Sequence, residues 1–330
     1  MDLRPFLQGG VAALALLLCQ GAAAQAPGGY PNRPIRMVVP FAAGSAADSL
    51  ARVVATQLAD QLGQPVVIDN KAGAGGTIGT ADIAHAAPDG YTIGLAAQGT
   101  LVNNQALYAK PGYDSVKDFT PIAEVAGVQN VLVVAPASPY RKVGELLAAI
   151  RAKPAEAFSF SSSGTGTSHH IAGVVLGQYT KPLMHVPFTG APQGITAIMG
   201  GNVDMGLYNI PAALAQVRGG KLKALAVTGL TRSSLLPDVP TLDESGLKGY
   251  EVTLWWGYIA PAGLPPELLA RLHAELDKVM SRPELRARLL EQGFTLPPVP
   301  LAPPAAFGAL IGRELDKWLP VMRKIGAATN

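Results

Sequence analysis

A short stretch after an apolar segment carries residues suited to holding an anion. Positions 40–54 read PFAAGSAADSLARVV, in which small residues fill positions 42–47 and Ser45 and Asp48 have the spacing of a helix capping box. Free N–H groups in the first turn of a helix attract anions, and small side chains let a carboxylate approach them closely. We therefore expect a carboxylate site that needs no lysine or arginine. The alternative is a plain turn in which Asp48 only caps a helix.

Three further stretches of small residues also follow predicted strands. They are 161–173 (SSSGTGTSHHIAG), which offers several hydroxyls beside free amides, 70–79 (NKAGAGGTIG) and 186–194 (VPFTGAPQG). Each by itself is compatible with a flexible turn or a helix cap. The ligand crevice of a parallel sheet lies at the carboxyl ends of its strands, so four such turns together predict one binding site there.

The same stretches lack the motifs of nucleotide-binding and hydrolytic enzymes. Ile78 and His169 stand where a G-x-G-x-x-G motif needs its third glycine, and neither a P-loop nor a G-x-S-x-G motif is present. On a helix the adjacent His169 and His170 point about 100° apart and make a poor metal pair. We therefore expect no cofactor and no metal. An exported hydrolase that uses Ser168 and His169 is the enzyme alternative.

An acidic residue and a tryptophan pair complete the candidates. Asp204, in the segment GGNVDMGLYN, is either a buried acid that hydrogen-bonds backbone amides across a cleft or a solvated loop acid. One of Trp255 and Trp256 could face the cleft, although core packing is the commoner role for both.

Strands and helices alternate along the chain. The pattern predicts helices over 48–63, 143–154, 265–281 and 303–319, a short Ala-rich helix between the loop 71–79 and Pro88, and a loop and helix over 164–180. It predicts strands over 35–39, 65–70, 91–97, 130–136, 158–162, 184–188, 204–209 and 223–229. This rhythm argues for mainly parallel sheets with helices on both faces, which is an α/β fold.

The pattern restarts once, which indicates two domains. We place the chain crossings near residue 130 and near residue 253, the second within the apolar segment 250–261 (YEVTLWWGYIAP). Residues 27–130 and 254–330 then form the first domain, because the C-terminal helices return to it, and residues 131–253 form the second. The ligand cleft lies between the two domains.

The N-terminus indicates export. Arg4 precedes the apolar run 11–19, and Ala24-Gln25-Ala26 fits the A-x-A cleavage rule. We predict a signal peptide over residues 1–26, which is too short to be a typical membrane span, and a periplasmic location. Cys19 is the only cysteine and lies within this segment. Disulfide, thiol and thiolate–metal chemistry are therefore not expected in the rest of the chain.

Charge and composition narrow the partners. The chain has 26 Lys and Arg residues against 23 Asp and Glu residues, a net charge of +3, and 6% aromatic residues. Without a basic run or an aromatic surface, nucleic acid and anionic membranes are poor default partners.

Long segments of the chain resemble the Bug-type receptors, the substrate-binding proteins of tripartite tricarboxylate transporters. They are 30–58, 66–95, 161–173, 186–205, 220–229 and 255–265, and the resemblance extends over essentially the whole chain after the predicted signal peptide. It implies a two-domain periplasmic binding fold of type II, which closes on its ligand like a flytrap. The implied ligands are small organic acids, whose carboxylate is held by backbone amides, hydroxyls and ordered water.

Matching positions imply ligand contacts in this chain. The first-domain carboxylate loop corresponds to Phe41, Ala42, Gly44, Ser45 and Asp48. The anchoring loop of the second domain corresponds to Ser163, Gly164, Thr165, Thr167, Ser168 and His169. Neighbouring cleft positions correspond to Gln98, Thr189, Gly190, Ala191 and Asp204.

Several positions depart from the family pattern. Gly44-Ser45 replaces two consecutive glycines, Ala47 replaces a threonine-like residue, AQGT at 97–100 replaces a Ser/Thr-rich segment, and His170 replaces a leucine. Ser45 adds a hydroxyl, whereas Ala47 and Ala97 remove polar groups. The identity of the acid is therefore open, and a partly apolar or aromatic acid is one hypothesis.

These features together predict a monomeric extracytoplasmic solute receptor, not an enzyme. It would capture a small organic acid for the membrane permease subunits of a tripartite tricarboxylate-type transporter. A periplasmic sensor that feeds a signalling system is an alternative, because the two differ in partner and not in pocket chemistry. A cleft that has lost ligand binding is a further alternative.

Overall fold

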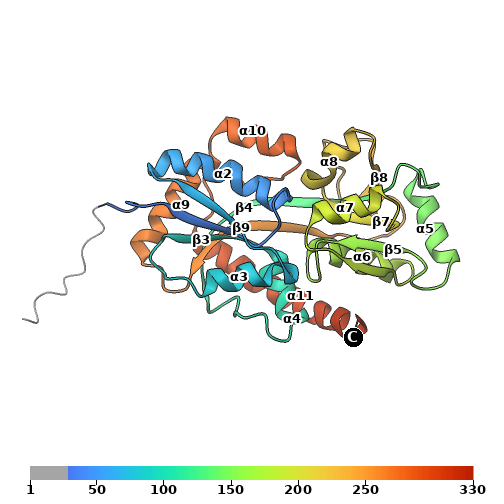
Figure 1. Ribbon diagram of the computed structural model, residues 1–330, viewed down its shortest axis with the longest axis horizontal. Coiled ribbons are helices and arrows are strands. Elements are labelled where there is room, and N and C mark those ends of the chain that lie inside the picture. Colours follow the sequence, from blue (N-terminus) through green and yellow to red (C-terminus); the bar gives the residue numbers. More distant parts are fainter. Residues whose placement is uncertain (1–28, 330) are drawn as a thin grey trace, which may run out of the picture. The chain divides into compact units, whose positions relative to one another are not determined.

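The computed structural model describes residues 29–329, in which the strands form one continuous nine-stranded sheet (Figure 1). The strand order is β2-β1-β3-β9-β4-β7-β5-β6, and β8 pairs with β4. The predicted signal peptide, with Cys19, lies outside the described residues. Arg33–Asn330 forms one compact unit, which holds all the elements described below.

The first strand group follows the predicted parallel pattern. It consists of β2 (Val66–Asn70), β1 (Ile35–Val39), β3 (Thr92–Ala97) and β9 (Thr253–Pro261), and β1 pairs in parallel with both β2 and β3. β9 runs antiparallel to β3. Helices α2 (Ala46–Leu62) and α3 (Thr77–Ala84) lie on opposite faces of this group, which explains why β1 reads as a continuous apolar run (Figure 1).

Helix α2 begins and ends where its sequence signals predict. Ser45 is the N-cap, since its side chain accepts a hydrogen bond from the backbone N–H of Asp48. Gly63 ends the helix in the left-handed conformation, at φ +67°. Leu50, Val54 and Leu58 are fully buried on one face, because residues four apart share a helix face.

The second strand group repeats the arrangement. It contains β7 (Met205–Asn209), β5 (Ser159–Ser162) and β6 (Met184–Pro187), in which β5 pairs in parallel with both neighbours, and β8 (Lys223–Val227). The helices of this region are α5 (Val143–Ala152), α6 (Ser168–Tyr179), α7 (Ala191–Met199) and α8 (Ile210–Arg218), and α6 and α7 lie on opposite faces of the strands (Figure 1).

Strand β4 (Phe119–Val134) connects the two groups. It pairs with β9 as far as Gln129, and from Asn130 onward it pairs with β7 and β8. The sequence pattern predicted only its second half, because Pro121 and Gly127 interrupt the first half. The domain boundaries near residues 130 and 253 stay a prediction, although β4 changes its pairing partners near residue 130.

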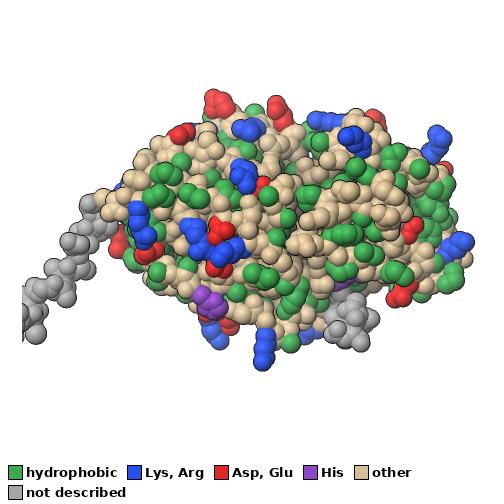
Figure 2. Space-filling view, in the orientation of Figure 1, with side chains coloured by type: hydrophobic (Ala, Val, Ile, Leu, Met, Phe, Trp, Pro, Cys, Tyr) green, Lys and Arg blue, Asp and Glu red, His purple; other side chains and the backbone are tan. Residues whose placement is uncertain are grey.

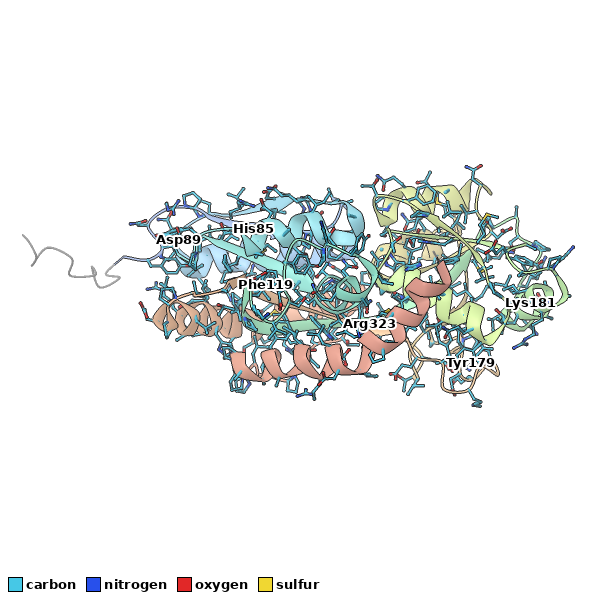
Figure 3. All side chains as sticks on the ribbon, turned by 90° about the horizontal axis from the view of Figure 1, so that it is seen from below. His85, Asp89, Phe119, Tyr179, Lys181 and Arg323 are labelled. Atoms are coloured by element: carbon cyan, nitrogen blue, oxygen red, sulfur yellow. The ribbon has the colours of Figure 1, made fainter. Side chains whose placement is uncertain are left out.

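The C-terminal helices pack back on the first group, and the last also reaches the second. They are α9 (Pro266–Met280), α10 (Pro283–Gln292) and α11 (Pro304–Thr329). Phe307, Ile311 and Leu315 of α11 pack in a core with residues of β1 and β9, whereas Met322 packs with residues of the second group. Figure 3 shows α11 from below, running from the first group toward the second, where Arg323 is labelled.

The surface and the helices give two further observations. On the face drawn in Figure 2, charged side chains of both signs are interspersed, and no extended patch of one sign appears. Within residues 29–329, no helix is both long and apolar enough to cross a membrane.

Candidate ligand-binding site

A cavity lies at the carboxyl ends of β1, β3, β5, β6 and β7. This is the edge at which parallel sheets place their ligands. None of the residues that line it carries a formal charge. The lining residues are Phe41, Ala42, Ser45, Ala46, Ala47, Gly75, Ala97, Gly99, Ser163, Thr167, Ser168, His169, Thr189, Gly190, Ala191, Asn209, Leu254 and Trp256.

Three helices begin at this cavity. The N-cap residues of α2, α6 and α7 are Ser45, Thr167 and Gly190, and all three line it. The first-turn N–H groups of a helix have no intrahelical partner, and the helix dipole makes that end attractive to anions. The cavity therefore offers a positive potential from backbone amides rather than from cationic side chains.

The loop before α2 is braced from behind by Asp48. Its carboxylate accepts hydrogen bonds from the Gly44 N–H at 2.9 Å, from Arg52 Nε at 2.9 Å and from Asn70 Nδ2 at 3.0 Å. Burial by itself would raise the pKa of Asp48, but the hydrogen bonds from Arg52, Gly44 and Asn70 outweigh it and lower that pKa. Asp48 is 4% exposed and does not line the cavity, so it shapes the loop from behind.

Across the cavity, His169 links two polar side chains. Its Nδ1 lies 2.8 Å from Ser163 Oγ, and its Nε2 lies 3.0 Å from Asn209 Oδ1. Burial lowers the pKa of His169 to about 4, so its ring is neutral at pH 7. The Ser168–His169 pair of the hydrolase alternative is not formed, because the two ring nitrogens of His169 contact Ser163 and Asn209 instead.

Backbone groups from the two sides meet beside the cavity. Tyr108 Oη donates to the Thr165 carbonyl at 3.1 Å, and Asn103 Nδ2 donates to the Gly166 carbonyl at 3.0 Å. Gly75 has φ +61°, and a Cβ atom there would lie 2.0 Å from the Thr165 carbonyl oxygen. Only glycine fits this contact, which holds the segment after β2 against the segment after β5.

The structure brings ten of the predicted residues to the cavity wall. Six other predicted residues lie elsewhere. Gly44, at φ +76°, forms the turn behind Ser45 and is held by Asp48. Gly164 and Thr165 line an adjacent pocket on the other side of the Gly75 contact. Gln98 turns away from the cavity and donates to Glu314 Oε2 of α11 at 2.8 Å.

Asp204 corrects the expectation of a buried acid at the cleft. It is exposed, and it lies immediately before β7, at the opposite end of the strand from the cavity. Its carboxylate accepts from the backbone N–H and the hydroxyl of Ser159, both at 2.7 Å. Because residues that precede a strand lie at its amino end, Asp204 joins the starts of β5 and β7 instead.

The sequence reasoning did not assign eight lining residues. Ala46, Ala47 and Gly75 lie in stretches singled out as small-residue turns, so their composition was a usable signal, whereas Ala97 and Gly99 lie in the segment 97–100 that was noted only as a departure from the family pattern. Asn209 and Leu254 gave no local signal, since the fold alone brings the end of β7 and the start of β9 to the cavity. Trp256 is 2% exposed and lines the cavity, and its buried indole N–H has no hydrogen-bond partner.

The fold is that of the periplasmic solute-binding proteins. The solved structure of the periplasmic binding protein BugD is 35% identical, superposes with a TM-score of 0.85, and aligns over 90% of this chain and 99% of its own. MatC from Rhodopseudomonas palustris, solved with bound malate, is 33% identical with a TM-score of 0.83 over 89% of this chain and 100% of its own. Rpa4515 of R. palustris, solved with adipate, is 29% identical with a TM-score of 0.85 over 91% and 99%.

The family follows from the sequence itself. The model of the tripartite tricarboxylate transporter family receptor, TctC, matches residues 50–327. The chain belongs to this family, as the resemblance to Bug-type receptors predicted. Family and fold are those of solute-binding proteins and not of enzymes. In residues 29–329, no group of three or more His, Cys, Asp and Glu side chains is arranged to hold a metal ion.

Proposed function

We propose that this protein is a periplasmic receptor that captures a small organic acid for a tripartite tricarboxylate-type transporter. One observation carries the proposal: α2, α6 and α7 all begin at a cavity whose lining has no formal charge. A carboxylate is an acceptor-only group, and backbone amides at helix starts supply donors without a competing counter-ion.

The ligands of the relatives agree with this chemistry. MatC was solved with malate and Rpa4515 with adipate, and both ligands are carboxylates. In the proposed complex, the amides of Ala46 and Ala47 hold one carboxylate of the ligand. The contacts of Gly75 and Tyr108 with Thr165 close the cavity, exclude water and strengthen those hydrogen bonds.

A ligand screen tests the proposal. Thermal unfolding of the purified protein is measured with mono-, di- and tricarboxylates, acidic amino acids and aromatic acids, with the amides of the same acids as neutral controls. An acid at about 100 times its Kd adds roughly 2.7 kcal/mol to the free energy of unfolding. We expect acids to raise the Tm and their amides to leave it unchanged. No shift with any acid, in protein shown to be free of bound ligand, contradicts the proposal.

A charge variant tests the helix-start site directly. Ala47→Asp places a carboxylate in the first turn of α2, where the dipole favours it, so the helix is retained while the ligand carboxylate is repelled. We expect the thermal shift to disappear. Thr56→Asp adds the same charge at an exposed position of the same helix and is the matched control. Equal binding by both variants would exclude α2 as the carboxylate site.

The compartment and the transporter partner belong to the same proposal. We infer that residues 1–26 are removed on export, because Ala24-Gln25-Ala26 fits the cleavage rule. Fractionation of cells that express the full chain, with N-terminal sequencing of the periplasmic protein, should give Ala24–Ala26 as the last residues removed. Uptake of the identified acid by cells with and without the cognate permease then distinguishes a transport receptor from a sensor.

A further inference from the structure

A chain of hydrogen bonds behind the cavity has a fixed direction. It starts at the Ser168 carbonyl oxygen, which can only accept, and Asn130 Nδ2 lies 3.3 Å from it. Asn130 Oδ1 is therefore left to accept from Asn209 Nδ2, at 2.6 Å. The orientation of both amides follows from that one carbonyl oxygen, and it turns Asn209 Oδ1 toward His169.

The same series of hydrogen bonds determines which nitrogen of His169 carries the proton. Asn209 Oδ1 is an acceptor 3.0 Å from Nε2, so Nε2 donates. The Asn209 backbone N–H also points at Nε2, as a competing donor, but at the longer distance of 3.4 Å, and we assign the tautomer from the shorter contact. Because burial keeps the ring neutral, Nε2 carries its only proton, and Nδ1 has a lone pair.

Ser163 consequently donates away from the ligand. Its hydroxyl lies 2.8 Å from His169 Nδ1, and the lone pair there takes the hydroxyl hydrogen. Thr167 behaves alike, since its hydroxyl donates to the Gly164 carbonyl at 2.7 Å. Both hydroxyls line the cavity with only their oxygen lone pairs left to offer. This wall therefore differs from the opposite wall, where the amides of α2 are donors.

From this polarity we propose that Ser163 recognises a hydrogen-bond donor on the ligand, so that the substrate is a hydroxy acid or an amino acid. The inference rests on the proposed function and sharpens its substrate class. A plain carboxylate oxygen that faces Ser163 would find no donor there, because both groups would offer only lone pairs. A hydroxyl or ammonium group satisfies Ser163 while the carboxylate binds the helix amides. Asn209 and His169 are positioning residues, because they fix the direction of the Ser163 hydroxyl.

Calorimetric titration with matched acids tests the proposal. The pairs are malate and succinate, glutamate and glutarate, citrate and tricarballylate, and mandelate and phenylacetate, which differ by one hydroxyl or amino group. We expect the wild-type protein to bind the donor-bearing member of a pair roughly tenfold more tightly, the equivalent of one well-placed hydrogen bond. In Ser163→Ala that ratio should fall toward one, with the affinity for the plain acid unchanged.

Two more variants complete the test. Ser159→Ala removes a hydrogen-bonded serine from the far end of the same strand and should keep the wild-type ratio. His169→Phe removes the acceptor of the Ser163 hydrogen, so the hydroxyl can turn to donate, and the preference should move toward the plain acid.

The possible outcomes distinguish a failure of the role proposed for Ser163 from a failure of the receptor function. Binding of acids with a preference for the plain member, or with a donor preference that survives in Ser163→Ala, overturns the role of Ser163 and leaves the receptor function standing. A Ser163→Ala variant that weakens both members equally shows that Ser163 donates to the carboxylate, which also overturns it. No binding of any acid to the wild-type protein contradicts the receptor function, and with it this inference.

Discussion

The two walls of the cavity present polar groups to a ligand in different ways. At the start of α2 the wall is made of small residues, and the polar work falls to backbone amides held in place by the buried Asp48. At the start of α6 the wall carries side-chain hydroxyls: the neutral His169 fixes the direction of the Ser163 hydroxyl, and the Gly164 carbonyl fixes that of Thr167. Both walls offer backbone amides at helix starts, and the wall at α6 adds side-chain hydroxyls that accept hydrogen bonds.

This difference explains how an uncharged cavity can be selective. Helix amides attract carboxylates in general, and they discriminate little between one acid and another. Selectivity then depends on the second wall, where a misplaced donor or acceptor leaves a buried polar group unsatisfied. The following variants and measurements test whether the two walls contribute differently to binding and stability.

The largest expected effect is a loss of stability at low pH, which comes from the buried histidines at the start of α6. Burial lowers the pKa of His169 to about 4, and burial with the nearby His185 lowers that of His170 to about 3. The unfolded chain therefore binds protons below pH 6.5 that the folded chain does not, so stability falls as the pH drops from about 7 toward 4. By pH 5 each of the two costs about 2 kcal/mol. Urea unfolding at pH 7, 6 and 5 measures this loss.

A single histidine variant identifies the source of that loss. His170→Leu removes one of these titrating groups and should reduce the loss between pH 7 and 5 by about 2 kcal/mol, the contribution of His170. His273→Gln, which removes a histidine at a partly exposed position, is the control variant. A profile unchanged in His170→Leu would place the titrating group elsewhere.

Pushing the two walls apart should weaken binding most among the single substitutions. Gly75→Ala places a methyl group 2.0 Å from the Thr165 carbonyl oxygen. If only about 1% of the variant reaches the closed arrangement, its apparent Kd rises roughly 100-fold. Gly201→Ala imposes a similar backbone strain, at φ +73°, with nothing within 4 Å of the new atom. Titration of both variants with the acid found in the screen distinguishes the effect of backbone strain from that of the clash with Thr165. Equal losses of affinity in the two variants would contradict the role of the Gly75–Thr165 contact.

The brace of the first wall should matter more than its counterpart in the second group. Asp48→Ala leaves the Gly44 N–H without its acceptor and the Asn70 amide with only the Phe41 carbonyl, at a cost of about 2 kcal/mol in the free energy of unfolding. Asp204→Ala removes an exposed acid that joins two strand starts, at a cost of about 1 kcal/mol or less. Urea midpoints compare the two. A larger loss in Asp204→Ala would reverse the ranking.

The smallest expected effect is spectroscopic. Trp256 lines the cavity, whereas Trp255 and Trp318 line a neighbouring pocket. Binding of an acid should change the indole emission of the wild-type protein, and Trp256→Phe should lose most of that change. Trp255→Phe serves as the control and should keep it.

Much of the fold was predictable because its signals are local. The Ser45 cap, the leucines four residues apart and Gly63 predicted α2, and the apolar runs predicted β1 and β3. The first half of β4 was missed because Pro121 and Gly127 are poor strand residues, yet long pairing with β9 overrides that local preference. Helices α7, α8 and α10 were also not predicted.

The sequence alone determined the family, the α/β class and the four small-residue turns, because capping, strand and glycine signals act within a few residues of each other. Only the tertiary structure decided which groups face the ligand. It brought Asn209 and Trp256 to the cavity, placed Asp204 at the opposite end of its strand, and put Asp48 behind the wall. It also set the direction of the Ser163 hydroxyl, since that depends on Asn130 and Asn209, which are 79 residues apart along the chain. Hydrogen-bond direction is a property of partners in space, and spacing along the chain does not encode it.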